Sequence, residues 1–237
     1  MSLLFERFAT PIQVVITIGL YVQIAVLGGV ATAPGMYLAL MAWDATAGWA
    51  PFARVAAGCC LGWAVFFSYA ICVIFVVGAF RVVTRAGSPV GTFPYYSFQA
   101  FRWASYNALI LMVRYTSMDF IRVTPFLTLF HRMMGMRIGR RVQINTTIVG
   151  DANLIEIGDD TVIGGDVTLV AHAAEHGRLV IAPVKIGSRV TVGLLSVVFP
   201  GVTIGDGATI GAHAVLTKGT SVGAGEVWGG VPARRIR

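Results

Sequence analysis

Two histidines and a glutamate capable of acid–base chemistry, His172, Glu175 and His176, stand close together in the chain. They lie in the segment His172–Pro183, which interrupts a regular repeat. An imidazole titrates near neutral pH, so it can remove a proton from a hydroxyl or amine as that group attacks a substrate. An insertion that projects from a rigid repeat structure is where binding residues are expected. The placement of these side chains therefore depends on the repeat that flanks them.

The repeat has a period of six residues. From Ile186 to Trp228, an aliphatic or aromatic residue recurs at every sixth position, namely Ile186, Val192, Val198, Ile204, Ile210, Leu216, Val222 and Trp228. No helix or alternating strand has this period, so the pattern indicates a repeat architecture. Position two of the hexad is often glycine, and position five is small. Such hexads predict short strands joined by tight turns, three to a triangular coil, with one continuous aliphatic core. We expect the glycines at the corners, where the chain bends.

The repeat extends upstream of the interruption, although less regularly. Its register slips by one residue between Gly150 and Ile157, so we expect a slightly irregular first coil. The repeat breaks after Leu169 and resumes in register after the His172–Pro183 segment. Earlier hexads begin at Ile138, Ile144, Ile157 and Ile163.

The first part of the chain is strongly apolar, and the mean hydropathy of the whole chain is +0.76. Val55–Phe80 contains no charged residue and is long enough to span a hydrocarbon core of roughly 30 Å. We predict that residues 1–86 form transmembrane helices at about 11–43 and 55–83. Pro34-Gly35 should break the first helix, and a pair of short or re-entrant segments is the alternative there.

The arginines predict an orientation. They gather after Phe80, whereas the turn between the two apolar stretches holds only Arg54. The positive-inside rule then places the repeat domain on the cytoplasmic side of a bacterial inner membrane crossed more than once. The net charge of +7 predicts contact with anionic lipids, and no nucleic-acid motif is present. Cys59, Cys60 and Cys72 lie in the second apolar stretch without ligand spacing, so we interpret them as packing residues.

Residues 87–136 connect the apolar helices to the repeat. Gly87–Phe101 is rich in proline, glycine and aromatic residues and predicts a loop at the membrane surface. From about Trp103 to Met136 the sequence is helical in character, with a break at Pro125. We expect amphipathic helices on the cytoplasmic leaflet rather than a third span.

Two motifs in the repeat domain carry a family resemblance. Val198–Gly219 reads VFPGVTIGDGATIGAHAVLTKG, and Trp228–Arg237 reads WGGVPARRIR. Both resemble the hexapeptide-repeat acyltransferase family, the first its most recurrent segment and the second its terminal Gly-x-Pro-Ala-x-x-Ile-Arg pattern. The resemblance implies a left-handed parallel β-helix at residues 137–237. Because the same coil occurs in nucleotidyltransferase tails and carbonic anhydrases, it indicates the fold more strongly than the activity.

The resemblance also implies roles for particular residues. In sugar-modifying members, a histidine opens the loop that interrupts the coil, which makes His172 the expected general base. Glu175 would orient the ring or contact the acceptor, and His176 would be a competing base. The donor would be acetyl-CoA or another acyl-CoA, held between the subunits of a homotrimer, and no metal is expected. Gly193, Ser196, Gly211 and Ala212 would line the pantetheine arm, and Lys218, Arg234 and Arg235 would meet the nucleotide phosphates.

The junction Thr124–Val142 resembles membrane-attached members, including the C-terminal region of nonribosomal poly-amino-acid synthetases, which leaves a dimer open as an alternative to the trimer. The leading hypothesis is a membrane-bound acyltransferase. It would move an acetyl or other short acyl group to a hydroxyl or amine of a lipid-linked, glycan or peptidyl acceptor. A second hypothesis is a non-catalytic module that forms trimers or docks a synthetase. A third is a zinc hydratase of the carbonic anhydrase type, with His172, His176 and His213 as ligands, although their order along the chain differs from that family.

Overall fold

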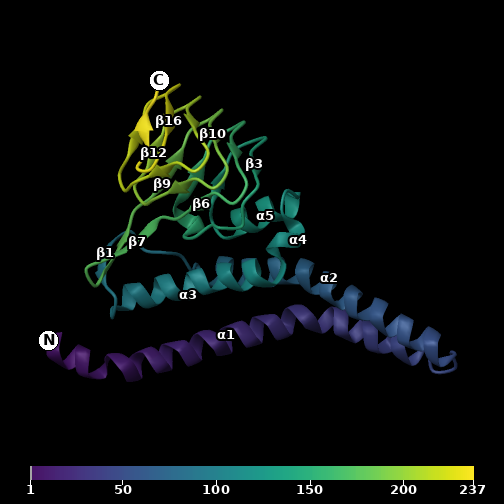
Figure 1. Ribbon diagram of the computed structural model, residues 1–237. Helices are drawn as coiled ribbons and strands as arrows, with labels where there is room; N and C mark the ends of the chain where they lie inside the picture. The colour runs from purple at the N-terminus through teal and green to yellow at the C-terminus, as the bar shows by residue number, and fades with distance from the viewer. Residues whose placement is uncertain (1) are drawn as a thin grey trace.

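The computed structural model describes the backbone of residues 2–237 and the side chains of residues 13–237. It has three parts: a hairpin of two long helices, a layer of shorter helices, and a triangular coil of β-strands (Figure 1). The layer lies between the other two, so that α3 has the coil on one side and α1 on the other (Figure 1).

The long hairpin consists of α1 (Ser2–Asp44) and α2 (Pro51–Thr84). Pro51 occupies the first turn of α2, where its missing N–H costs no hydrogen bond. Gln13–Asp44 and Pro51–Thr84 are each long and apolar enough to cross a membrane. Apolar helices are therefore present where the sequence predicts them.

Helix α1 differs from its prediction at Pro34-Gly35. It continues through this pair as one helix in place of a broken helix or two short segments, and it bends along its length (Figure 1). Gly35 instead has a packing role, because a Cβ added there would lie 2.8 Å from the Cβ of Ser68 on α2. Small residues at such a contact let two apolar helices approach closely.

The layer contains β1 (Gly91–Pro94), α3 (Phe98–Val113), a π-helical turn at Arg114–Met118, α4 (Asp119–Ile121) and α5 (Pro125–Met133). Ser97 caps α3 by accepting a hydrogen bond from the backbone N–H of Ala100. The predicted break at Pro125 is confirmed, since this proline begins α5. The prediction of a loop over Gly87–Phe101 is wrong in part, because the segment includes β1 and the start of α3.

The coil is built from short parallel strands on three faces. One face is a sheet of order β15-β12-β9-β4-β2, the second is β17-β16-β13-β10-β5-β3, and the third is β14-β11-β6, with only β17 antiparallel to its neighbour. The coil strands are β2 (Arg137–Ile138), β3 (Gln143–Ile144), β4 (Ile155–Ile157), β5 (Val162–Ile163), β6 (Thr168–Leu169), β9 (Val184–Ile186), β10 (Thr191–Val192), β11 (Val197–Val198), β12 (Thr203–Ile204), β13 (Thr209–Ile210), β14 (Val215–Leu216), β15 (Ser221–Val222), β16 (Val227–Gly229) and β17 (Arg234–Arg235). Three hexads make one coil, as the period predicts.

Burial follows the hexad. Position one is buried from Ile186 to Val222, and position five is buried from Val190 to Ala214. The left-handed backbone falls at position four, where φ is positive at Arg189, Leu195, Gly201, Gly207, His213, Gly219 and Gly225. The expectation that the position-two glycines supply the bend is therefore wrong. A Cβ added at Gly193 would lie 2.5 Å from the backbone nitrogen of Ala212, so glycine is needed there for close stacking of successive coils.

The interruption of the repeat is a hairpin of β7 (His172–Glu175) and β8 (Arg178–Ile181). Strand β1 pairs antiparallel with β8, so a segment from just before α3 completes a three-stranded sheet. This pairing fixes the start of α3 beside the coil and brings residues 88–107 against the first turns of the repeat.

Candidate active site

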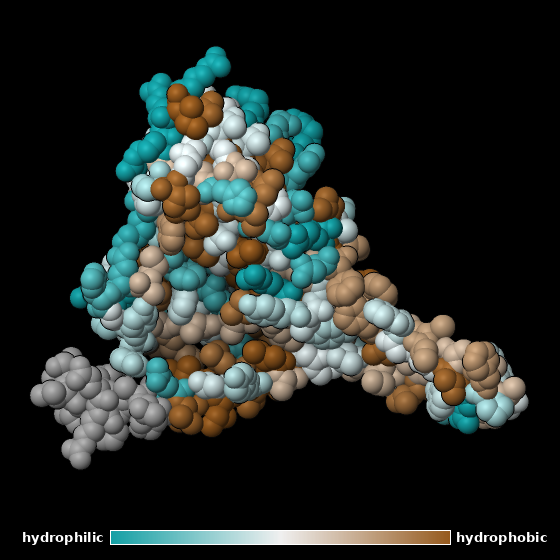
Figure 2. Space-filling model, viewed as in Figure 1, coloured by the Kyte–Doolittle hydropathy of each residue, from teal (hydrophilic) through white to brown (hydrophobic). Residues whose placement is uncertain are grey.

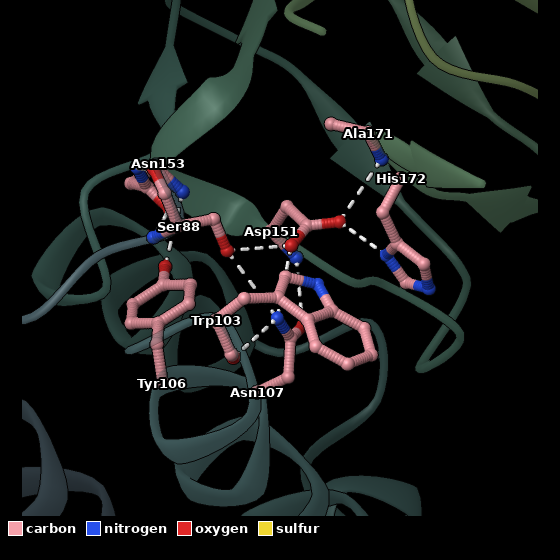
Figure 3. A network of polar contacts seen from close by, with 8 residues as sticks. All are labelled: Ser88, Trp103, Tyr106, Asn107, Asp151, Asn153, Ala171 and His172. Carbon is pink, nitrogen blue, oxygen red and sulfur yellow. Dashed lines mark hydrogen bonds and ion pairs between the residues drawn. The ribbon is translucent and has the colours of Figure 1, made fainter. Parts of the chain in front are cut away.

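The side chains of His172 and Asp151 form a hydrogen-bonded pair where the coil meets α3 (Figure 3). The Nδ1 atom of His172 lies 2.5 Å from Oδ2 of Asp151. Asp151 is fully buried, whereas the side chain of His172 is 26% exposed. The second ring nitrogen of His172 points away from Asp151 (Figure 3). A buried carboxylate thus orients a histidine whose other nitrogen is available for proton transfer.

Three further donors hold the Asp151 carboxylate. Its Oδ1 accepts hydrogen bonds from the Ser88 hydroxyl at 2.6 Å and from the Asn107 side-chain amide at 2.9 Å. Its Oδ2 also accepts from the backbone N–H of Ala171 at 3.2 Å. The side-chain oxygen of Asn107 in turn accepts from the backbone N–H of Asp151 at 3.0 Å. Both oxygens of the buried carboxylate are therefore satisfied, as its burial requires.

A second set of contacts fixes Ser88. Its backbone N–H donates to the side-chain oxygen of Asn153, and the Asn153 amide donates to the Ser88 carbonyl. The Tyr106 hydroxyl accepts from the backbone N–H of Asn153 and donates to the carbonyl of Met134 at 2.6 Å. The network thus ties the segment after α2, helix α3 and the first coil to one carboxylate (Figure 3).

Asp151 occupies the irregular point of the first coil. Its φ is 56°, a left-handed conformation that aspartate tolerates better than most residues, and it precedes the 3₁₀ turn Ala152–Leu154. This is the place where the hexad register slips between Gly150 and Ile157. The irregularity turns the aspartate out of the repeat and toward α3, where Asn107 and Ser88 meet it.

The electrostatics of the pair favour a charged aspartate. Burial by itself raises the pKa of Asp151, but the hydrogen bond and charge of His172, with the hydrogen bonds from Ser88 and Asn107, outweigh burial and hold this pKa below its ordinary value. Burial raises the pKa of the nearby Tyr106, which therefore stays protonated as a donor. A carboxylate that remains charged selects the His172 tautomer with its proton on Nδ1.

A cavity of about 230 Å³ opens in front of His172. It lies between α3 and the first coil, and its walls are mostly apolar. The Trp103 ring meets the His172 ring edge-on, with the ring centroids 4.9 Å apart. Arg114, at the start of the π-helical turn, contributes the cationic side chain of the cavity. The site is therefore a small pocket with one oriented imidazole.

The hairpin places the other predicted catalytic residues away from the His172 ring. The carboxylate of Glu175 pairs with Lys218 on the coil. In this structure, each of these two side chains is therefore paired with the other, and their predicted roles toward the acceptor and the nucleotide phosphates stay predictions. His176 lies at the hairpin tip with a φ of 46°.

The residues expected along the pantetheine arm lie at a different corner of the coil. Gly193 stacks directly on Gly211 and Ala212 of the next turn. Ser196 is fully buried, and its hydroxyl donates to the carbonyl of Gly211 at 2.9 Å. Ser196 is therefore an inward position-five residue, and its side chain is not on the surface of the coil.

The last strand carries the two C-terminal arginines. Arg234 and Arg235 form β17 and are exposed, and Arg235 pairs with Glu226 at 3.0 Å. Arg234 donates to the adjacent carbonyl of Ala233.

The histidines do not form a metal centre. Within residues 13–237, no group of three or more His, Cys, Asp or Glu side chains is placed to hold a metal ion. His213 lies at a coil corner with a φ of 58°, separate from the hairpin. His131 is fully buried on α5, and neither ring nitrogen has a hydrogen-bond partner among the described residues. Burial lowers the pKa of His131 to about 4, so this side chain is neutral.

The sequence identified His172 but not the residues that orient it. Asp151, Ser88 and Asn107 belong to no motif, and they stand far apart in the chain. The slip of register at Gly150–Ile157 was the only signal, because a residue expelled from a regular repeat is free to serve another purpose.

Comparisons with known proteins address the coil. A family model described as the hexapeptide repeat of succinyl-transferase matches residues 183–218. No curated protein matches the chain. The matched residues run from the end of the hairpin through β14, the part of the coil with the most regular hexads.

Several solved structures are similar. A hexapeptide-repeat-containing acetyltransferase from Vibrio cholerae, in complex with acetyl coenzyme A, is 29% identical, with a TM-score of 0.40 over 44% of this chain and 60% of that chain. A maltose O-acetyltransferase from Clostridium difficile is 30% identical, with a TM-score of 0.40 over 44% of this chain and 59% of that chain. A galactoside acetyltransferase in complex with coenzyme A is 26% identical, with a TM-score of 0.48 over 67% of this chain and 89% of that chain. The chain spans about three fifths of the first two proteins.

Proposed function

We propose that this protein, whose coil belongs to the hexapeptide-repeat acyltransferase family, transfers an acyl group from acyl-CoA to a membrane-associated acceptor. The observation that carries the proposal is the His172–Asp151 pair in a pocket beside that coil. The matched repeat at residues 183–218 and the acetyltransferases among the similar structures support a thioester donor.

The chemistry follows from the orientation of the imidazole. With its Nδ1–H bonded to Asp151, His172 presents an unprotonated Nε2 to the hydroxyl or amine of the acceptor. The acceptor attacks the thioester carbonyl while Nε2 takes its proton. The tetrahedral adduct then breaks its C–S bond, and the imidazolium returns the proton to the leaving sulfur. The products are an ester or amide and free CoA thiol. The Asp151 carboxylate stabilises the imidazolium that forms between the two steps.

The donor would approach along the coil. Gly193, Gly211 and Ala212 lie at one corner and are at least partly exposed, and in a trimer the backbone there would line a groove for the pantetheine arm. Arg234 remains a candidate phosphate contact because its exposed side chain makes no ion pair with any residue among 13–237. In a trimer, this corner of one copy would face the His172 pocket of another.

The membrane part would hold the enzyme beside its acceptor. Gln13–Asp44 and Pro51–Thr84 have the length and hydropathy of membrane spans. The arginines after Phe80 favour a cytoplasmic coil and contact with anionic lipids. An acceptor confined to the same surface gains in local concentration, which raises the rate without any further contact.

The test is acetyl-CoA binding and thiol release by the detergent-purified protein, with His172→Ala as the variant. We expect both proteins to bind acetyl-CoA and only the unsubstituted protein to release thiol. Thiol release that is unchanged in His172→Ala would exclude His172 as the base. If neither protein binds acetyl-CoA, the acyltransferase proposal fails and a docking module becomes the better interpretation.

A further inference from the structure

A trough runs between α1 and α3 on the side of α3 that faces the long hairpin. One cavity of about 510 Å³ lies between the start of α3 and α1, and its walls include Gln13, Ile16 and Phe101. A second cavity of about 510 Å³ follows α1 from Gln13 to Tyr21. The two share Gln13, Ile16 and Ala104 and so form one depression. We call it the α1–α3 trough.

The trough is apolar along its length. Its walls are aromatic and aliphatic side chains, and Gln13 is among its few polar ones. Figure 2 shows hydrophobic residues gathered beneath the coil, in the region of α1 and α3. Each cavity lies within the size range of small-ligand sites, and apolar walls of this kind bind apolar groups by removing them from water.

The trough lies next to the catalytic pocket. Trp103 lines both the trough and the cavity that contains His172, so this residue stands between them. The indole N–H of Trp103 has no hydrogen-bond partner among the described residues, so a turn of this ring would break no hydrogen bond. Next to Trp103, the trough is lined by Ala100 and Ala104, whose small side chains leave space above this part of α3.

We infer that the acceptor is an amphiphile, with one alkyl or prenyl chain in the α1–α3 trough and its nucleophilic headgroup past Trp103 at His172. The inference rests on the proposed function and names the substrate class of the same site. One wall of the trough is α1, which has the length and hydropathy of a membrane span, so a chain enters sideways from the bilayer. At Trp103 the trough adjoins the cavity that holds the imidazole. A membrane helix along one wall and a catalytic pocket beside it fit a lipid rather than a water-soluble sugar.

The experiment uses hexadecanol with a diazirine in the middle of its chain as the probe. The purified full-length protein is reconstituted in phosphatidylethanolamine–phosphatidylglycerol vesicles with the probe and acetyl-CoA. Two quantities are measured: photolabelling of the peptides that carry Phe101 and Ile16 relative to peptides of α2, and acetylation of the probe relative to hydrolysis of acetyl-CoA. Labelling of α2 reports general contact with lipid and serves as the internal reference.

Ala104→Trp fills the trough, and Arg102→Trp adds the same ring to an exposed position of the same helix. Arg102→Gln controls for the lost charge. We expect Ala104→Trp to reduce both the relative trough labelling and the ratio of probe acetylation to hydrolysis at least fivefold, and Arg102→Trp to match Arg102→Gln. Ala104→Leu, with a smaller side chain, takes its place if the tryptophan variant does not fold.

The outcomes separate the two proposals. Equal trough labelling in Ala104→Trp and Arg102→Trp overturns the trough as a lipid site, even where thiol release depends on His172. Trough labelling without probe acetylation, in a protein that acetylates short water-soluble alcohols, overturns the amphiphilic acceptor. Absence of thiol release in every sample refutes the proposed function, and with it the assignment of the trough to an acceptor.

Discussion

Substitution of Asp151 by asparagine tests whether the buried carboxylate orients the base. The change keeps the shape of the side chain and removes its charge. All four groups that contact the carboxylate are donors: the Ser88 hydroxyl, the Asn107 amide, the Ala171 N–H and the His172 ring. An asparagine side chain has one acceptor oxygen and one donor NH₂. Whichever way it is turned, its NH₂ therefore faces groups that now donate to the carboxylate.

The magnitude follows from where the amide points. If its NH₂ faces Nδ1 of His172, the ring must accept there and carry its proton on Nε2, so the catalytic nitrogen no longer accepts a proton. General-base catalysis contributes about 10²–10⁴-fold, so we expect a fall in kcat of that order, or about 3–5 kcal/mol in the barrier. If the NH₂ faces Ser88 and Asn107, the Ser88 hydroxyl can turn to accept from it, but the buried hydrogen bond from the Asn107 amide is lost, and stability falls by about 1–3 kcal/mol.

The assay is thiol release from acetyl-CoA in detergent, with acetyl-CoA affinity and the melting temperature measured on the same samples. Ser88→Ala is the matched control, because it removes one hydrogen bond to Asp151 but preserves the charge and the His172 tautomer. Its kcat should fall at least tenfold less than that of Asp151→Asn. The reasoning is refuted if Asp151→Asn is folded, binds acetyl-CoA and keeps kcat within threefold of the unsubstituted protein.

Three further predictions concern stability and the hairpin. Because His131 is buried with a pKa lowered from 6.5 to about 4, the unfolded chain takes up a proton first as pH falls, so unfolding should become easier by about 3 kcal/mol between pH 6.5 and 4. His131→Leu should flatten this part of the melting-temperature profile, and an unchanged slope would contradict it. Gly164→Ala should destabilise the coil by about 1–3 kcal/mol in chemical denaturation, because its Cβ would lie 2.7 Å from the backbone of the next coil, whereas Gly165→Ala should be neutral. Equal effects at the two glycines would rule out the stacking argument. Glu175→Gln should change kcat less than threefold, since its carboxylate pairs with a lysine rather than with His172, and a loss as large as that of His172→Ala would restore Glu175 to the catalytic set.

The hexad period predicted the coil because its information is local. Position one points inward in every hexad from Ile186 to Val222, and the strands pair with those one coil away in the predicted register. The position of the left-handed residue was not predicted, because glycine occurs at position two for stacking and at position four for backbone conformation. Composition alone does not separate these two causes.

The long helices were predicted as elements but not in their shape. Pro34-Gly35 carries the signal of a helix break, yet α1 continues, since its neighbour α2 packs closely at Gly35 through Ser68. Contact with a second helix outweighs the local preference of the proline. The hairpin at His172–Ile181 was expected as a loop for a related reason, because its third strand, β1, comes from a distant segment.

By itself, the sequence determined the triangular coil, the apolar helices and the candidate base, because each depends on residue types at short, regular spacing. Only the tertiary structure decided which group orients His172 and which cavities lie beside it. Asp151 becomes its partner because α3 and the segment after α2 supply donors that stabilise a buried charge. The trough exists because α1 and α3 lie side by side (Figure 1). Both depend on contacts between residues far apart in the chain, which no local pattern records.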